Sequence, residues 1–308
     1  MAGGFVHISA AAEALGRLKE VDGLTSPDKR VLRQLQPFVE VGSVGPDYPY
    51  LGGQSKWADL MHYEMTGETI RNGVRVLRRF ESGSHSHRAM AWLLGYCAHV
   101  ATDLTIHPVV ERCVGTYADN KKKHRVCEMN QDAFIWKGRN LGDIGLADYF
   151  NLNIRHCSDE DGDLHSAVVE LWLMMLEFSY PESYATERPE IQRWNKGFRV
   201  IVDSIDDLGS LFAFSRHLLA GQGVAYPSPD AIDMTYVENL QTPEGLQHYS
   251  QVFDRAVGSV ISLWSVVGRA LHATNEATAE AILQEVPDGN LDTGKSLAGS
   301  HYIFWAEV

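Results

Sequence analysis

The sequence lacks any segment that marks it for a membrane or for signal-directed export. No stretch approaches the length of an apolar membrane span, and the chain begins with neither a basic start nor a long apolar run. We therefore expect no transmembrane segment. As written, the sequence predicts a cytoplasmic protein or one exported by a route that needs no cleaved signal.

Cysteine is scarce, and its spacing is irregular. The sequence holds four cysteines, and no two of them form a Cys-x-x-Cys pair: Cys97, Cys113, Cys127 and Cys157. This spacing argues against a zinc ribbon and against a redox motif. An unpaired thiol in apolar helical sequence behaves as a small hydrophobic side chain. We expect all four cysteines to be reduced.

Positive charge is also in short supply. Lysine and arginine number 27 against 40 acidic residues, which gives a formal net charge of −13. Such a surface repels polyanions and offers no general attraction to nucleic acid or to anionic lipid. A phosphate-bearing substrate would need local cations to overcome that field, and a bound metal would supply them.

Alternating strand patterns are nearly absent, apart from the short tail that begins at Tyr302. Helical patterns are abundant, and we expect helices at residues 8–18, 26–38, 66–80, 88–107, 121–137, 163–178, 189–220 with breaks, and 244–273. Clusters of glycine, proline and aspartate predict loops at 42–53, 221–233 and 287–294. Because no linker or repeat is visible, the fold class predicted is all-α, with residues 1–308 forming a single multi-helix domain.

Three polar residues lie on one stripe of the expected helix at 88–107. His99, Asp103 and His107 follow one another at intervals of four, so all three side chains face the same way. The residues between them are apolar, which predicts burial, and a buried carboxylate with two imidazoles needs an interaction that offsets its desolvation. A bound cation would do so. A single His-x3-Asp pair is more often only a hydrogen-bonded pair at a helix seam, and the third residue strengthens the metal interpretation.

The next residue, Pro108, bears on where this helix ends. Because the residue before proline disfavours α geometry, we expect the helix to stop or kink at His107. A second polar stripe follows in the expected helix at 121–137, where His124, Glu128 and Asp132 again lie four residues apart. We interpret Asp132 as an outer residue that supports ligands and not as a ligand.

The candidate ligands, in chain order, form a recognisable series. They are His7-Ile8, the loop Gly42-Ser-Val-Gly-Pro-Asp47, His62, the helix Gly95-Tyr-Cys-Ala-His99-Val-Ala-Thr-Asp103, His107-Pro108, and His124-Arg-Val-Cys-Glu128. This series resembles the zinc-dependent phospholipase C family, whose helical fold is shared with the fungal single-strand-specific zinc nucleases. The resemblance covers roughly the first 140 residues, and the later helices are expected to complete the bundle around a polynuclear metal site.

The resemblance implies two to three zinc ions and assigns a set of ligands to each ion. Asp47, His62 and His99 would hold one zinc, and Asp103 would bridge it to a second that His7 also binds. The remaining residues would hold a third zinc: His107, His124 and Glu128. Imidazole together with carboxylate suits zinc, and a bridging carboxylate brings two such ions close together. The resemblance also implies that Tyr48 lies beside the substrate head group.

One feature departs from the family pattern. In the family, the N-terminal tryptophan of the processed enzyme chelates the zinc of the first histidine, whereas this chain has no tryptophan near its start. We therefore expect the zinc at His7 to be held more weakly, completed differently, or missing.

The function that these residues predict is a zinc metallo-phosphodiesterase. Zinc lowers the pKa of a bound water toward 7, and Asp47 is the candidate catalytic base. The leading substrate is a phospholipid, cleaved as by a phospholipase C to diacylglycerol and a phosphorylated head group, with transient contact to a membrane surface. The alternatives are a phosphodiesterase that cuts single-stranded nucleic acid, which the net charge disfavours, and a metal-stabilised helical protein that binds without turnover.

Overall fold

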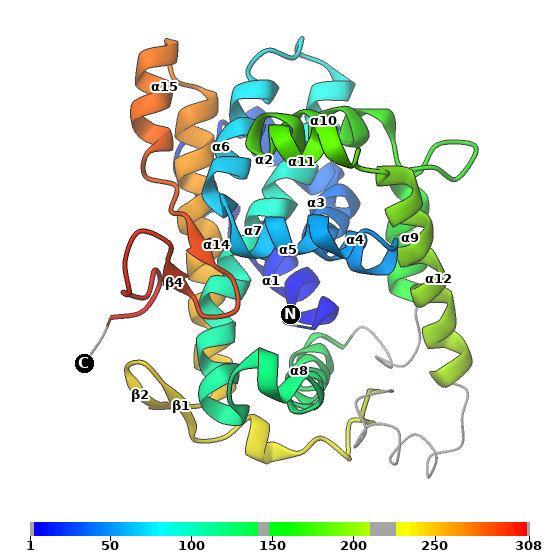
Figure 1. Ribbon diagram of the computed structural model, residues 1–308, viewed down its shortest axis with the longest axis vertical. Coiled ribbons are helices and arrows are strands. Elements are labelled where there is room, and N and C mark those ends of the chain that lie inside the picture. The colour runs from blue at the N-terminus through cyan, green and yellow to red at the C-terminus, as the bar shows by residue number, and fades with distance from the viewer. Residues whose placement is uncertain (1–2, 141–147, 210–225, 307–308) are drawn as a thin grey trace.

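Helices make up the architecture, as expected. The computed structural model describes residues 3–140, 148–209 and 226–306. The helices of its N-terminal half are α1 (Gly4–Gly16), α2 (Ser26–Gln34), α3 (Gln36–Gly42), α4 (Tyr48–Leu51), α5 (Ser55–Tyr63), α6 (Thr66–Leu77), α7 (Ser84–Val114) and α8 (Tyr117–Arg139). They are followed by α9 (Asp148–His156), α10 (Ser166–Ser179), α11 (Pro181–Thr186), α12 (Ile191–Gly209), α14 (Tyr249–Leu271) and α15 (Glu276–Leu283) (Figure 1). The all-α prediction is confirmed.

Several boundaries differ from the expected ones. The helix expected at 26–38 is two helices that meet at Leu35, and a proline follows two residues later. The loop expected at 42–53 contains a 3₁₀ turn at Gly45–Asp47 and the short helix α4. The prolines of this stretch occupy first-turn positions, where a missing N–H costs nothing. The expected helix at 189–220 is observed to Gly209, and its remainder lies outside the described residues.

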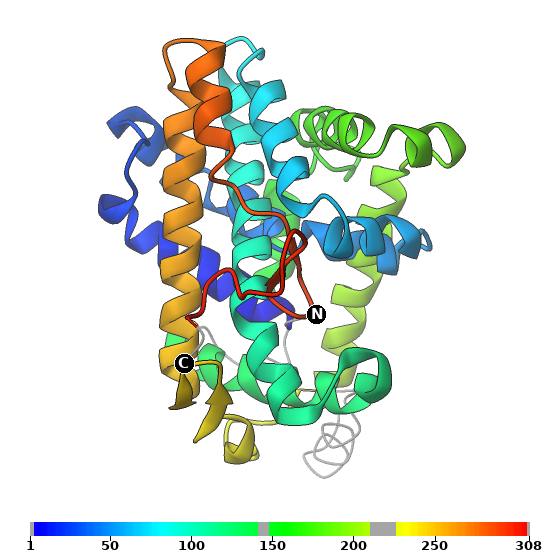
Figure 2. The ribbon, with the colours of Figure 1, turned by 60° about the vertical axis from the view of Figure 1, so that its left-hand side comes forward.

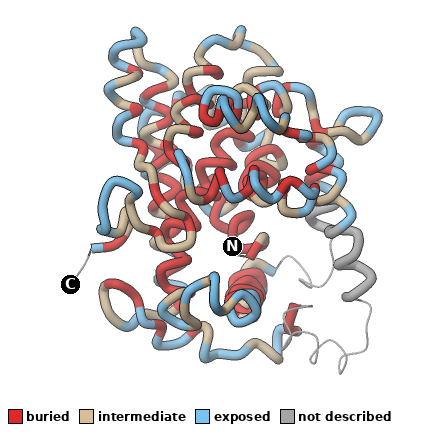
Figure 3. The backbone as a smooth tube through the Cα atoms, viewed as in Figure 1, coloured by how far each residue is buried: buried red, intermediate tan, exposed pale blue. Residues whose placement is uncertain are grey.

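Helix α7 is the centre of the molecule. It packs along α3 and α14 and also touches α1, α6, α8 and α10. Its residues are buried continuously from Ala89 to Val110, and Figure 3 shows this buried column running through the middle of the fold. A helix that is surrounded by others must be apolar on every side. Burying its polar side chains therefore costs desolvation free energy, which an additional interaction has to offset.

The expected end of this helix at His107 is not observed, because α7 continues through Pro108 to Val114. Proline removes the hydrogen bond to the carbonyl four residues earlier, here that of Leu104. Gly294 packs into this place: a Cβ on it would lie 2.5 Å from the Leu104 oxygen and 2.3 Å from Pro108 Cγ. Its φ of +67° also requires glycine. Gly294 therefore covers the place in α7 where proline leaves the Leu104 carbonyl without its helical hydrogen bond.

Two small hairpins complete the fold. Strands β1 (Leu240–Thr242) and β2 (Gly245–Gln247) pair antiparallel, as do β3 (Gly289–Asn290) and β4 (Lys295–Ser296). The second hairpin crosses the middle of α7 beside α5 (Figure 2). Within the described residues, no helix combines the length and the apolar character needed to span a membrane. The four cysteines are free thiols, as expected.

Candidate metal centre

The eight predicted ligands come from five different elements and meet at one place. His7 lies in α1, Asp47 ends the 3₁₀ turn and His62 lies in α5. Helices α7 and α8 supply the other five: His99, Asp103, His107, His124 and Glu128. Their side-chain atoms form a continuous series of near contacts, none longer than 3.9 Å. The structure therefore brings together every residue that the sequence singled out as a metal ligand.

Asp103 is the common neighbour of the histidines. Its Oδ1 lies 3.3 Å from Nε2 of His7 and 3.4 Å from Nε2 of His107. Its Oδ2 lies 3.1 Å from Nε2 of His99 and 3.9 Å from Nε2 of His62. A carboxylate with both oxygens turned toward different imidazoles has the arrangement that a bridging metal ligand requires.

Burial and charge act in opposite directions on this carboxyl group. Asp103 is fully buried, which disfavours its charged form, but the imidazoles of His107, His99 and His7 overcome that effect and hold its pKa well below the ordinary value. The pKa of Asp47 is likewise lowered, because His99 and His62 outweigh burial. Burial also lowers the pKa of His107. Ionised carboxylates and neutral imidazoles are the forms that bind metal.

Backbone carbonyls hold four of the imidazoles by their outer nitrogens. His62 Nδ1 lies 2.7 Å from the Ala58 oxygen, and His99 Nδ1 lies 3.0 Å from that of Ser43. His107 Nδ1 is 2.7 Å from the Leu291 oxygen, and His124 Nε2 is 2.6 Å from that of Gly115. A carbonyl only accepts, so each outer nitrogen carries the proton, and the inner nitrogen is left with a lone pair. Outer-shell bonds of this kind orient the histidines of metal sites.

One contact is difficult to explain without a cation. Nε2 of His62 and Nε2 of His99 lie 3.3 Å apart, and both rings donate their Nδ1 proton elsewhere. Two lone pairs therefore face each other in a buried site. Within the described residues, both nitrogens of His7, both oxygens of Asp103 and Nε2 of His107 also lack a hydrogen-bond partner of normal geometry. Buried polar atoms without partners are costly, and bound cations would satisfy those that face the cluster.

Two sets of three residues have ligand atoms within 4.8 Å of one another and are able to hold a metal ion. One set is His7, His99 and Asp103, and the other is Asp47, His62 and His99. The second set is identical to the one that the resemblance implies for the first zinc. The first set contains His7 and Asp103, which the resemblance assigns to the second zinc, and it also includes His99. The third predicted set is more open: Glu128 Oε1 lies 3.9 Å from His107 Nε2 and 3.9 Å from His124 Nδ1. The donor types throughout fit zinc.

Asp132, interpreted from sequence as an outer residue, contacts the backbone next to a predicted ligand and not a ligand side chain. It is buried and accepts hydrogen bonds from the Val6 backbone N–H at 2.7 Å and the Tyr226 hydroxyl at 2.9 Å. Burial raises its pKa to about 7 against the opposing effect of these donors. A Cβ on Gly3 would lie 1.8 Å from its Oδ2, so only glycine permits this approach. Asp132 thereby fixes the first turn of α1 through Val6, the residue directly before His7.

Tyr48 does not occupy the position that the resemblance implies. Its side chain is completely buried, stacks on Phe198 at 4.4 Å between ring centroids and meets Trp172 edge-on. A ring in this aromatic core does not contact a substrate that enters from solvent. Tyr50, two residues later, lies with its ring centroid 5.7 Å from that of His62 and is a better candidate for such a contact.

Sequence reasoning missed the part of the site that comes from the C-terminal hairpin. Leu291 accepts from His107 and donates its backbone N–H to the His62 carbonyl at 2.9 Å. Asp292 accepts from the Tyr63 hydroxyl at 3.0 Å and lies 3.9 Å from His107 Nδ1. Backbone partners leave no mark in a sequence. Asp292 gives no spacing signal either, because it is a single aspartate in a predicted loop and lies 185 positions after His107 in the sequence.

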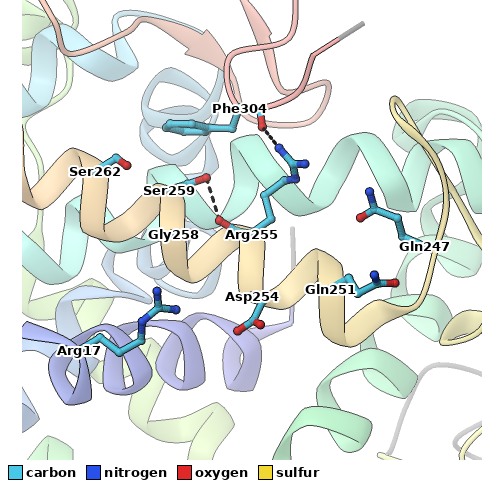
Figure 4. A pocket seen from close by; sticks show the side chains of 9 residues that line it. All are labelled: Arg17, Gln247, Gln251, Asp254, Arg255, Gly258, Ser259, Ser262 and Phe304. Atoms are coloured by element: carbon cyan, nitrogen blue, oxygen red, sulfur yellow. Dashed lines mark hydrogen bonds between the residues drawn. The ribbon is translucent and has the colours of Figure 1, made fainter. Parts of the chain in front are cut away.

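A separate hollow of about 620 Å³ lies on α14, bordered by Arg17 of α1 and Phe304 near the C-terminus (Figure 4). Its arginines already have partners, since Arg17 pairs with Glu20 and Arg255 with Glu244. None of the predicted metal ligands lines it. We therefore assign it no part in the metal centre.

Comparison with known proteins gives one match. The sequence profile of the family described as zinc dependent phospholipase C matches residues 6–182, which is more than half of the chain. That range contains all eight predicted ligands. No curated protein and no solved structure matches the chain.

Proposed function

Because the chain belongs to the zinc dependent phospholipase C family, we propose that it is a zinc-dependent phosphodiester hydrolase that cleaves phospholipids into diacylglycerol and a phosphorylated head group. The observation that carries this proposal is the facing pair of Nε2 atoms in His62 and His99, 3.3 Å apart beside two carboxylates, which is the arrangement that a shared cation would bring together. We also propose that residues 1–308 act as one domain, since the C-terminal hairpin contacts two ligand-bearing helices.

The proposed ligands are the eight clustered residues, and the cofactor is two to three zinc ions. Zinc, when bound, lowers the pKa of a coordinated water and stabilises charge on a phosphoryl oxygen. Asp47 is the proposed base. Its side chain is 15% exposed, which makes it the most accessible of the three proposed ligand carboxylates, and its lowered pKa keeps it ionised and able to accept a proton. Nε2 of His62 lies 3.3 Å from this carboxylate, so a zinc ion held there would engage both side chains.

The chain's own charge bears on the choice of substrate. With a net charge of −13, the protein repels a polyanion along most of its surface. A phospholipid presents a single phosphodiester to the site, whereas a nucleic acid presents a long series of them. This difference supports the phospholipid over single-stranded nucleic acid as substrate.

Metal removal tests the proposal directly. We expect the purified protein to hydrolyse a chromogenic phosphodiester and to release diacylglycerol from neutral phospholipid vesicles, to lose both activities in a chelator, and to regain them with zinc. Single-stranded DNA serves as the comparison substrate. Cleavage of DNA without release of diacylglycerol would favour a nuclease, and bound zinc without any turnover would favour a binding protein.

The third ligand set makes a separate prediction. Replacing His124 or Glu128 with alanine should each lower zinc affinity by a similar factor, because both residues are assigned to one ion. Replacing both should cost less than the sum of the single losses, since the ion is already lost in either variant. Zinc titrations of the four proteins complete the cycle. Additive losses would show that the two residues serve different ions.

A further inference from the structure

The hairpin of β3 and β4, residues 288–296, lies against the metal centre although it is outside the region that matches the family profile. The Leu291 backbone joins two ligands, accepting from His107 Nδ1 at 2.7 Å and donating to the His62 carbonyl at 2.9 Å. Gly294 fits against Leu104 and Pro108 of α7. The hairpin is thus anchored both at the two ligands and at the stretch of α7 that carries His107.

Within this hairpin, the Asp292 side chain is turned toward the centre. The Asn290 side-chain oxygen accepts from the backbone N–H groups of Asp292 at 3.0 Å and Thr293 at 3.1 Å, which closes a turn around it. One Asp292 oxygen then lies 3.9 Å from His107 Nδ1, and the other accepts from the Tyr63 hydroxyl at 3.0 Å. The side chain is only 17% exposed.

We propose that Asp292 is a positioning residue of the metal centre, whose carboxylate places negative charge beside the Nδ1 proton of His107 and thereby strengthens Nε2 as a zinc ligand. A metal-binding histidine commonly has a carboxylate or carbonyl beyond its outer nitrogen, which fixes its orientation and increases its basicity. Here the Leu291 carbonyl accepts the hydrogen bond at 2.7 Å, and the Asp292 carboxylate lies 3.9 Å from the same nitrogen. The inference rests on the proposed zinc site and adds a residue to it.

A different role for Asp292 would be to hold the hairpin through Tyr63 alone. Asp292→Asn separates the two roles, because the amide oxygen still accepts from the Tyr63 hydroxyl while the negative charge beside His107 is lost. Asp59→Asn is the matched control. Asp59 also accepts from a tyrosine hydroxyl, that of Tyr50 at 2.8 Å, but it is exposed to solvent.

The experiment is a titration of the full-length, metal-free proteins with zinc against a competing chelator. We expect Asp292→Asn to weaken the binding of one zinc by about 10- to 100-fold, the usual cost of losing an outer-shell partner. Asp59→Asn should stay within about twofold of the wild type, and Asp292→Glu should recover part of the loss. Nitrogen-15 NMR of the histidines should show His107 protonated at Nδ1 in the wild type.

Two results would overturn the inference. One is unchanged zinc affinity in Asp292→Asn, and the other is an equal loss in Asp59→Asn accompanied by equal lowering of the melting temperature, which would indicate a structural role alone. A wild-type protein that binds no zinc would instead overturn the proposed function, and the inference with it.

Discussion

Replacing Asp103 with asparagine is expected to abolish turnover and to remove at least one metal ion. The side chain keeps its shape but loses the charge that lies within 3.4 Å of His7, His99 and His107. An amide also presents only one oxygen, so it cannot serve two ions in place of a carboxylate. Loss of an outer-shell partner already costs 10- to 100-fold, and we therefore expect a drop in activity of more than about 100-fold.

Metal content and activity, measured on the same preparation, check this prediction. Asp254→Asn provides the control, because it makes the same chemical change at an exposed position of α14. Wild-type turnover with an unchanged metal content in Asp103→Asn would contradict the assignment of Asp103 as a bridging ligand. Circular dichroism should show that the helices of the variant are retained.

The second large effect is expected at Gly95, where the backbones of α7 and α3 are in close contact. A Cβ on Gly95 would lie 2.1 Å from the Val39 carbonyl oxygen and 2.8 Å from the Gly42 Cα. Both atoms belong to backbone, which cannot move aside without shifting the helix. Gly95→Ala should therefore separate the two helices and destabilise the protein by about 1–3 kcal/mol or more. The same shift pulls the Ser43 carbonyl away from His99, so zinc affinity should also fall.

Gly258→Ala is the matched control for this substitution. Gly258 lies within α14, and a Cβ there would meet no atom within 4 Å. Alanine favours a helix over glycine by up to about 1 kcal/mol, so this variant should be as stable as the wild type or more stable. Urea unfolding of both variants, together with a zinc titration, measures the two effects. An unchanged midpoint for Gly95→Ala would show that α3 adapts at no cost.

The ligand helix could be predicted from sequence because its signal is local. His99, Asp103 and His107 lie one turn apart, and helical periodicity alone places them on one face. Residues distant in sequence, such as His7 and Asp47, could be assigned only through the order of motifs in a family. Geometry within one helix is a property of spacing, whereas geometry between helices depends on packing.

The features that the sequence could not predict are set by backbone atoms and by contacts between distant segments. The carbonyls of Ala58, Ser43 and Gly115 that orient the histidines carry no residue signature. The short helix α4 forms in a stretch rich in glycine and proline because its prolines fall at first-turn positions. Tyr48, next to a ligand in sequence, faces the aromatic core instead, since neighbouring residues of a helical turn point in different directions.

The bond between His107 and Leu291 spans 184 residues, and this separation has a consequence for biosynthesis. At about 5–20 residues per second, the ribosome needs on the order of ten to forty seconds to proceed from one residue to the other. During that interval all eight ligands have been made, while His107 still lacks the acceptor that selects its tautomer. The acceptor that orients His107 is therefore in place only late in the maturation of each nascent chain, once the hairpin has docked.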